Sequence, residues 1–338
     1  MQQVMASLPI IEFAPFRSPS STSNEREAVA RGLDNACRTS GFFYLRGHGV
    51  PRHLINSVRD RAIDFFQTAS DDDKQSLAIK PSDKARGYSK STDPSRGAYE
   101  ALDFYRPVDD TDGLCATGQG ANQWPSHPAD LRPTAEAYIA HMEMLGRSVT
   151  EALALALGID ISLLATRMDK AFWQLRMICY PGQHGGTPVK AGIGEHTDFG
   201  ILTFLLTDAT THALQVRSKT GEWIYADPVE VRKPKMEVLK HALVLMASQG
   251  ALLVNIGDML SEWTRGAYKS TAHRVIHTLP NARVSIPCFF DPNWDALIEP
   301  TLPTAAGEAE DGYLGMRYRD RYIRAVEQPL GEVGALPT

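Results

Sequence analysis

The spacing of the hydrophobic positions changes near the middle of the chain. In residues 25–40 and 53–69 they recur every three to four positions, as on one face of a helix. A longer stretch of the same kind runs over 133–157 and stops at Gly158. From Phe172 onward, short apolar runs separated by turn residues replace this spacing. The pattern therefore predicts a helix-rich first half followed by a β core.

Short apolar runs of strand length dominate the second half. They are FWQLRMICY, ILTFLLT, ALQVRS, EWIYA, ALLVNIG, HRVIHTL and RVSIPCFF. The first half adds one aromatic strand, GFFYLRGHGVP, and a short one at ALDFYRP in the irregular region 80–130, and a last helix is expected over 312–326. Consecutive strands with short turns are typical of a sandwich or barrel, so the predicted fold class is α+β with a mainly β core.

The segment 228–250, PVEVRKPKMEVLKHALVLMASQG, interrupts the strand pattern. It is too long for a hairpin turn and partly helical in spacing. A loop of this length inside a compact β domain is usually functional or an insertion. We therefore treat it as an insertion in the core.

Composition narrows the class of protein. The 338 residues are 43% hydrophobic, enough for one large domain or two closely packed ones. The net charge is −5 with scattered lysines and arginines, which argues against nucleic acid or an anionic membrane as a partner. The four cysteines form no CxxC pair, and neither a signal peptide nor a membrane-spanning apolar run is recognisable. We expect a cytoplasmic protein.

The stretch GIGEHTDFGILTFLL (192–206) contains the first candidate for chemistry. Residues i and i+2 of a strand project to the same face, so His196 and Asp198 could chelate one ion. Two histidines and one carboxylate are the donor set of non-haem Fe(II) oxygenases. An HxD pair alone also arises by chance, as a capping aspartate beside a turn histidine. No HExxH, GxSxG, P-loop or GxGxxG motif offers a rival site.

A third ligand would be a later histidine on a neighbouring strand. His273 in KSTAHRVIHTL is the first choice, and His277, on the same face of that strand, is the second. His212 and His241 fall in a turn and in the segment 228–250. The pattern therefore favours His273.

Arg283 and Ser285 suggest a second binding feature. They share one face of a strand, so a guanidinium and a hydroxyl could together bind a carboxylate. An arginine that points into a β core is costly unless it meets an anion. Tyr180, in RMICYPG, lies on a strand ahead of the proposed metal ligands.

In this combination and order, the motifs resemble the isopenicillin N synthase-like family of Fe(II)- and 2-oxoglutarate-dependent oxygenases. TSGFFYLRGHGVP is similar to the family's N-terminal signature, and YPG, HTDFGILTFLL, ALQV, GEW, LLVNIGDML, GAYKSTAHRV and RVS follow in its order. The resemblance covers nearly the whole chain. It implies a double-stranded β-helix (jelly roll) flanked by N-terminal and C-terminal helices. Residues 1–130 would be a helix-rich cover with an irregular substrate loop, 131–327 the catalytic core, and 328–338 a tail.

The resemblance also implies cofactors and roles. Iron would be held by His196, Asp198 and His273, and the distal carboxylate of 2-oxoglutarate by Arg283 and Ser285, with Tyr180 hydrogen-bonded to this cosubstrate. The implied reaction consumes Fe(II)-activated O2 and 2-oxoglutarate, releases succinate and CO2, and hydroxylates, desaturates or cyclises a small molecule.

Two features depart from the family pattern. Ile178 stands where many members have asparagine, so one polar contact to the cosubstrate is absent or replaced. Asp198 and His273 are 75 residues apart (273 − 198), which is longer than usual, and the segment 228–250 accounts for the excess.

Substrate contacts are expected from the irregular segment 86–106 and from apolar residues near the metal. The candidates are Tyr88, Arg96, Tyr99 and Phe104 in the segment, and Phe204 and Phe290 near the metal. Phe199, Leu202, Phe204 and Phe290 are also candidates for apolar walls that shield the reactive iron centre. A surface-loop position for the first group and plain core packing for the second are the alternatives. Arg176 and Arg274 are expected to pair with carboxylates.

Two other functions stay open. One is an Fe(II)/O2 oxidase of the isopenicillin N synthase type that needs no 2-oxoglutarate; the Arg-x-Ser pair does not separate it from the leading hypothesis. The other is a catalytically silent jelly-roll binding protein. The presence of His196, Asp198, His273 and Arg283 together argues against a protein without catalytic activity. The predicted partner is a small-molecule substrate.

Overall fold

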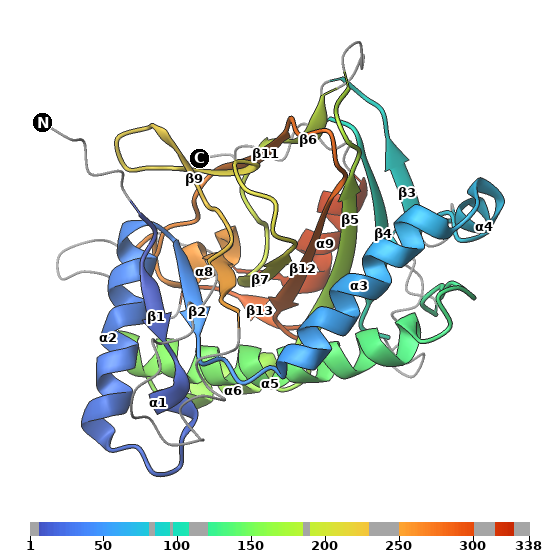
Figure 1. Ribbon diagram of the computed structural model, residues 1–338. Helices are drawn as coiled ribbons and strands as arrows, with labels where there is room; N and C mark the ends of the chain where they lie inside the picture. The colour runs from blue at the N-terminus through green and yellow to red at the C-terminus, as the bar shows by residue number, and fades with distance from the viewer. Residues whose placement is uncertain are drawn as a thin grey trace, which may run out of the picture.

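The computed structural model describes residues 7–80, 85–94, 97–107, 121–184, 190–229, 250–300 and 315–327. In this part of the chain two β-sheets face each other, and helices cover the other face of the larger sheet (Figure 1). The predicted α+β class, with a jelly-roll core flanked by helices, is confirmed. None of the helices described is long and apolar enough to span a lipid bilayer.

Among the described residues the larger sheet contains eight strands, with β1 parallel to β2 and the other neighbours antiparallel. In spatial order they are β1 (Ile10–Glu12), β2 (Phe42–Arg46), β10 (Leu252–Ile256), β7 (Leu202–Thr207), β12 (Arg283–Asp291), β5 (Phe172–Tyr180), β4 (Tyr99–Tyr105) and β3 (Gly87–Ser91). Strands distant in sequence are thus neighbours at the centre of the sheet.

The smaller sheet contains four strands in the part of the chain that the structure describes. They are β6 (Ala191–His196), β11 (His273–His277), β8 (Leu214–Arg217) and β9 (Trp223–Tyr225). Side chains of both sheets form one apolar cluster, with Tyr44 and Ile178 from the larger sheet and Leu214 and Val275 from the smaller. This cluster fills part of the space between the sheets. A short third sheet pairs β13 (Leu297–Ile298) with β14 (Met316–Arg317).

The long helix α5 (Leu131–Leu157) lies along the helix-covered side of the molecule (Figure 1). Helices α2 (Ser23–Thr39) and α3 (Arg52–Thr68) pack against it, and α3 and α5 both pack against β12. At its end, Gly158 adopts a φ of 67°, a left-handed conformation that suits glycine and stops the helix as predicted. The helices thereby cover the outer face of the larger sheet.

The other helices in the described part of the chain are short. They are α1 (Ala14–Arg17), α4 (Asp71–Ser76), α6 (Ser162–Met168), α8 (Asp258–Trp263) and α9 (Tyr318–Glu327). The last helix therefore begins later than the expected 312–326. Strand β6 was not among the predicted strands, because AGIGEH holds two glycines and has no alternating pattern; its pairing with β11 makes it a strand.

Several sequence predictions fall outside the described residues. These are Arg96, His241, residues 230–249 of the segment 228–250, and the tail 328–338. The domain boundaries at 130 and 327 stay predictions.

Candidate metal centre

Two of the predicted ligands are cross-strand neighbours in the smaller sheet. His196 is the last residue of β6 and His273 the first residue of β11, and the two are directly paired. Side chains opposite each other in antiparallel strands lie on the same face and in contact. The centroids of the two imidazole rings are accordingly 4.2 Å apart.

Asp198 reaches the same point from a turn. It lies two residues past the end of β6, before β7, so the expected placement of His196 and Asp198 along one strand is wrong. The turn brings its Oδ1 to 3.9 Å from His196 Nε2 and 3.6 Å from His273 Nε2. The three ligand atoms lie within 4.8 Å of one another, as a metal site requires. We refer to His196, Asp198 and His273 as the metal triad.

Backbone carbonyls set the orientation of both imidazoles. His196 Nδ1 lies 2.8 Å from the carbonyl oxygen of Gly194, and His273 Nδ1 lies 3.2 Å from that of Thr271. A carbonyl only accepts, so each Nδ1 carries the proton and each Nε2 keeps its lone pair for a metal. Burial lowers the pKa of His273, which favours the neutral imidazole that metal binding needs.

Asp198 uses its two oxygens differently. Its Oδ2 accepts hydrogen bonds of 2.6 Å from Thr203 Oγ1 and from Asn255 Nδ2, which are opposite each other on β7 and β10. Burial opposes ionisation of Asp198, but the positive charge that His273 and His196 carry when protonated and these two hydrogen bonds outweigh it and lower the pKa. The result is a fixed carboxylate whose Oδ1 points at both histidines.

The other candidate histidines have different partners. His277 is buried, and its Nε2 lies 2.7 Å from the carbonyl oxygen of Asn281. The exposed ring of His212 lies in a turn, 3.9 Å from a carboxylate oxygen of Asp227. The structure thus brings His273 to the HxD pair, in agreement with the first choice from sequence.

The predicted carboxylate clamp lies at the start of β12. Arg283 is paired with Tyr180 of β5, and its guanidinium carbon lies 5.0 Å from the centre of the tyrosine ring. The Nε and Nη1 atoms of Arg283 are buried and have no hydrogen-bond partner among the described residues. A buried guanidinium in this condition is costly unless an anion completes it. The residues present therefore fit a bound carboxylate.

Tyr180 and Ser285 complete the clamp. Burial raises the pKa of Tyr180, and the neighbouring guanidinium of Arg283 and hydroxyl of Ser285 oppose this effect. The phenol therefore keeps its proton and remains a donor. Ile178, the departure from the family pattern that the resemblance indicated, pairs with Ser285 and presents only an apolar side chain.

Three predicted substrate contacts lie on the helix-covered face of the larger sheet, away from the metal triad. Phe104, Phe204 and Phe290 belong to the core between the sheet and the helices. Phe104 stacks on Trp124 with ring centroids 3.9 Å apart. Successive strand residues face opposite ways, so Thr203 reaches Asp198 while Phe204 faces the helices. For these phenylalanines, and for Leu202, the core-packing alternative describes the structure.

The other substrate candidates have mixed positions. Tyr88 is buried, and burial together with the nearby Glu100 carboxylate raises its pKa. Tyr99 lies under the guanidinium of Arg176, 5.6 Å from carbon to ring centroid. Phe199, next to Asp198, contacts Tyr318 of the C-terminal helix α9, with ring centroids 5.8 Å apart. Tyr99 and Phe199 stay candidates.

The sequence singled out neither Asp103 nor Gln174. Asp103 on β4 is paired with Arg176 on β5, with 3.7 Å between Oδ1 and Nε, and Gln174 Nε2 donates to the same Oδ1 at 2.9 Å. Burial raises the pKa of Asp103, and Arg176 opposes this effect. Arg176 and Tyr180 are four residues apart on one strand, so both face the space between the sheets. A charged residue inside the apolar run ALDFY was the available signal.

The two extra arginines differ from each other. Arg176 pairs with a carboxylate, as expected. Arg274 has no carboxylate partner among the described residues: its Nε donates to Gln215 Oε1 at 2.8 Å, and its guanidinium carbon lies 4.0 Å from the centre of the Trp223 ring. Arg274 alternates with His273 along β11 and so faces away from the metal triad.

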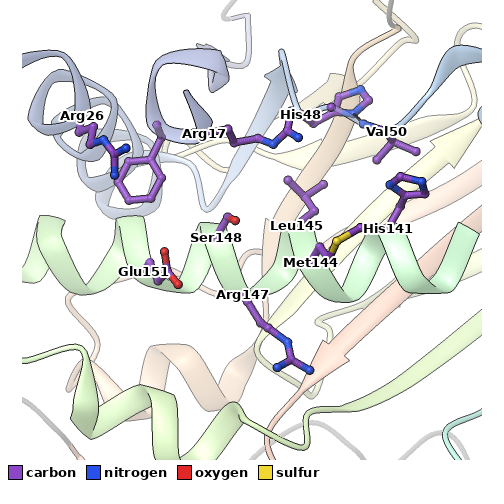
Figure 2. Close-up of a pocket in the computed structure, with 12 residues that line it drawn as sticks. Arg17, Arg26, His48, Val50, His141, Met144, Leu145, Arg147, Ser148 and Glu151 are labelled. Atoms are coloured by element: carbon purple, nitrogen blue, oxygen red, sulfur yellow. Dashed lines mark hydrogen bonds between the residues drawn. The ribbon is translucent and has the colours of Figure 1, made fainter. Parts of the chain in front are cut away.

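A separate cavity of about 520 Å³ lies between the N-terminal helices and α5 (Figure 2). Arg17, Arg26 and His141 are among its lining residues, and none of the metal triad is. His48 also lines the cavity, but both of its ring nitrogens already have hydrogen-bond partners. Its Nε2 lies 2.8 Å from the Gly250 carbonyl oxygen, and its Nδ1 accepts a hydrogen bond from the backbone N–H of Val50. The cavity is therefore distinct from the metal triad.

Comparisons with known proteins agree with this geometry. Residues 8–127 match the family described as non-haem dioxygenase in morphine synthesis N-terminal, and residues 172–292 match the 2OG-Fe(II) oxygenase superfamily. A homoarginine-6-hydroxylase of Oryza sativa subsp. japonica is 34% identical, covering 87% of this chain and 88% of the rice protein. The validamycin A dioxygenase of Streptomyces hygroscopicus subsp. limoneus is 31% identical, covering 90% and 82% respectively.

The fold is also similar to solved structures. The crystal structure of a full-length Neurospora crassa protein in complex with alpha-KG superposes with a TM-score of 0.79. The match covers 96% of this chain and 97% of the Neurospora chain at 24% sequence identity. This likeness supports the jelly-roll architecture.

Proposed function

The chain belongs to the 2OG-Fe(II) oxygenase superfamily, and from this we propose that it hydroxylates a small molecule that carries a carboxylate group. It is a non-haem Fe(II)- and 2-oxoglutarate-dependent oxygenase, which couples substrate oxidation by O2 to the decarboxylation of 2-oxoglutarate to succinate and CO2. The substrate class and the roles of individual residues are the proposed part.

In this proposal the metal triad holds Fe(II). Two neutral imidazoles and one ionised carboxylate oxygen suit this metal and leave coordination positions open for the reactants. When bound, the iron supplies the redox chemistry. Gly194 and Thr271 orient the imidazoles, and Thr203 and Asn255 hold the carboxylate.

Arg283, Ser285 and Tyr180 hold the far carboxylate of 2-oxoglutarate. The support is the pair of unpartnered buried nitrogens on Arg283 next to two hydroxyl groups. Together these donors orient the cosubstrate, and they favour binding of its carboxylate over water beside Arg283.

Arg176 carries the proposal for the substrate. It lies on the same strand face as Tyr180, its side chain is 25% exposed, and its Nε has no hydrogen-bond partner among the residues described. Asp103 and Gln174 form the polar wall beside it. A guanidinium held in this way can bind a substrate carboxylate. The named substrate of the plant relatives, homoarginine, is an amino acid and so carries one. Hydroxylation is favoured over desaturation or ring closure because these relatives are named hydroxylases.

To test this proposal, the protein is incubated with Fe(II), 2-oxoglutarate, O2 and one amino acid at a time, beginning with homoarginine. Succinate release and the mass of one added oxygen are measured together. With an accepted substrate, Arg176→Ala should raise KM by about 10- to 100-fold, the value of a lost charge-assisted hydrogen bond. Arg274→Ala, an arginine that faces away from the metal triad, is the control and should leave KM unchanged.

The carboxylate itself can be removed as a cross-check. The methyl ester of the substrate should bind the unmodified enzyme more weakly than the free acid does. In Arg176→Ala the ester and the acid should bind about equally, because the ester and the substitution remove the same interaction. Independent, additive losses would contradict a direct contact. Oxidation that proceeds without added 2-oxoglutarate would favour the oxidase alternative.

A further inference from the structure

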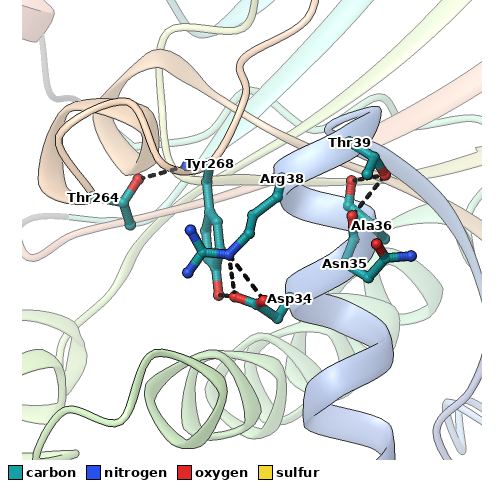
Figure 3. A network of polar contacts seen from close by, with 7 residues as sticks. All are labelled: Asp34, Asn35, Ala36, Arg38, Thr39, Thr264 and Tyr268. Atoms are coloured by element: carbon teal, nitrogen blue, oxygen red, sulfur yellow. Dashed lines mark hydrogen bonds and ion pairs between the residues drawn. The ribbon is translucent and has the colours of Figure 1, made fainter.

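The C-terminal end of α2 is fastened to the segment that leads into His273. Figure 3 shows Asp34 of α2 between Arg38 and Tyr268. The Tyr268 hydroxyl donates to Asp34 Oδ1 at 3.1 Å, and Arg38 Nε donates to both carboxylate oxygens at 2.9 Å. Tyr268 is fully buried, so its hydroxyl needs this acceptor.

Two more contacts join the same parts of the chain. The backbone N–H of Lys269 donates to the carbonyl oxygen of Cys37, in the last turn of α2, at 2.9 Å. A Cβ on Gly41 would lie 1.9 Å from the carbonyl oxygen of Lys269 and 2.9 Å from Thr271 Oγ1. Gly41 has a φ of 64° and no side chain, so glycine permits both this backbone conformation and the close approach.

This segment in turn orients His273. Its residue Thr271 supplies the carbonyl oxygen that lies 3.2 Å from His273 Nδ1. The ring of Phe42, next to Gly41, meets the His273 ring edge-on with centroids 5.3 Å apart. The histidine is thus supported on two sides by residues that depend on the region around Gly41.

We propose that Asp34 and Tyr268 are positioning residues for the metal triad, so that the N-terminal part of the chain sets the metal affinity of the catalytic core. The inference rests on the proposed role of His273 as a metal ligand. Asp34 fixes Tyr268, the fixed segment places the Thr271 carbonyl, and this carbonyl holds the Nδ1 proton so that Nε2 faces the metal. Loss of such an outer partner typically costs 10- to 100-fold in metal affinity.

Mn(II), a stable substitute for Fe(II), is the probe. Its dissociation constant is measured by calorimetry on the full chain, together with thermal unfolding of the metal-free protein. Tyr268→Phe removes only one hydroxyl and should weaken Mn(II) binding about tenfold. Asp34→Ala should do the same. Asp34→Asn keeps an oxygen acceptor for Tyr268 and should bind Mn(II) nearly as well as the unchanged chain.

The matched control is Thr22→Ala. Thr22 caps the other end of α2, where its hydroxyl accepts a hydrogen bond from the backbone of Glu25, so it lies a full helix length from Tyr268. Its removal should lower the stability of the protein while leaving Mn(II) affinity unchanged. The control separates a weaker helix from a misplaced ligand.

Each outcome has a distinct meaning. Unchanged Mn(II) affinity in Tyr268→Phe and Asp34→Ala, with a large loss in His273→Ala, would overturn the positioning role and keep the metal assignment. An equal loss of Mn(II) affinity in Thr22→Ala would also overturn the positioning role, because the lower stability of α2 would then explain the effect. Unchanged affinity in His273→Ala would show instead that the proposed metal ligand is wrong. His277→Ala should retain Mn(II).

Discussion

Asp198 illustrates how a site is built at the scale of single residues. One of its oxygens is held by Thr203 and Asn255, which leaves the other to face two imidazole nitrogens. The histidines follow the same logic, since a carbonyl engages one nitrogen and frees the other. The proposed donor set is thus oriented in the absence of an ion, which would lower the free-energy cost of binding one.

Arg283 carries a prediction at this scale. Arg283→Ala should raise the KM for 2-oxoglutarate by about 10- to 100-fold, because a charge-assisted contact to the cosubstrate is lost. The unfolding temperature of the cosubstrate-free protein should not fall, because two unpartnered buried nitrogens are removed. Decarboxylation measured across 2-oxoglutarate concentrations and a thermal melt check both parts. An unchanged KM would make Arg283 purely structural.

At the scale of elements, the contact between α5 and the larger sheet depends on one small residue. Gly146 lies in the interior of the helix, where alanine would ordinarily be about 1 kcal/mol better. A Cβ there would lie 2.6 Å from ring atoms of Phe290 on β12. The helix therefore packs closely on the sheet at the expense of local helix propensity.

Gly146→Ala should destabilise the protein by about 1–3 kcal/mol, since the extra methyl group forces Phe290 or the helix to move. Urea unfolding measures the effect. Met144→Ala, on the exposed side of the same helix, is the control and should change stability little. A gain in stability for Gly146→Ala would mean that helix propensity outweighs packing at this contact.

At the scale of the whole molecule, Asp291 connects three distant parts of the chain. It ends β12, accepts a hydrogen bond of 2.9 Å from the backbone of Ile201 near the metal triad, and accepts another of 3.0 Å from the Tyr318 hydroxyl on α9. Burial raises the pKa of Asp291 to about 7. The C-terminal helix is thereby tied to the turn that carries Asp198.

This carboxyl predicts a pH dependence of stability. The folded state keeps the proton up to about pH 7, whereas the unfolded chain releases it near pH 4, so Asp291 favours folding less and less as pH rises between these values. Compared with Asp291→Asn, the unchanged protein should lose at most about 4 kcal/mol of unfolding free energy from pH 4 to pH 8. Asp320→Asn, at an exposed position, is the control. A constant difference across this range would show that Asp291 is ionised in the fold.

Much of the architecture could be predicted because its signals are local. The helix that stops at Gly158 and the strand over residues 172–180 follow from apolar spacing and a left-handed glycine. Strand β6 could not be predicted in this way, because it depends for its hydrogen bonds on β11, which lies much later in the chain. The same dependence explains the error on Asp198, whose turn forms only where β6 ends.

The sequence by itself predicted the candidate residues of the site: two histidines and an aspartate as metal donors, and an arginine and a serine on one strand face. Tertiary structure alone decided which face of each strand lies toward the metal triad. The larger sheet is covered by helices on one side and by the smaller sheet on the other, so buried apolar side chains occur on both faces and periodicity does not distinguish the faces. Phe104, Phe204 and Phe290 therefore looked like pocket walls in sequence and pack against helices in the fold.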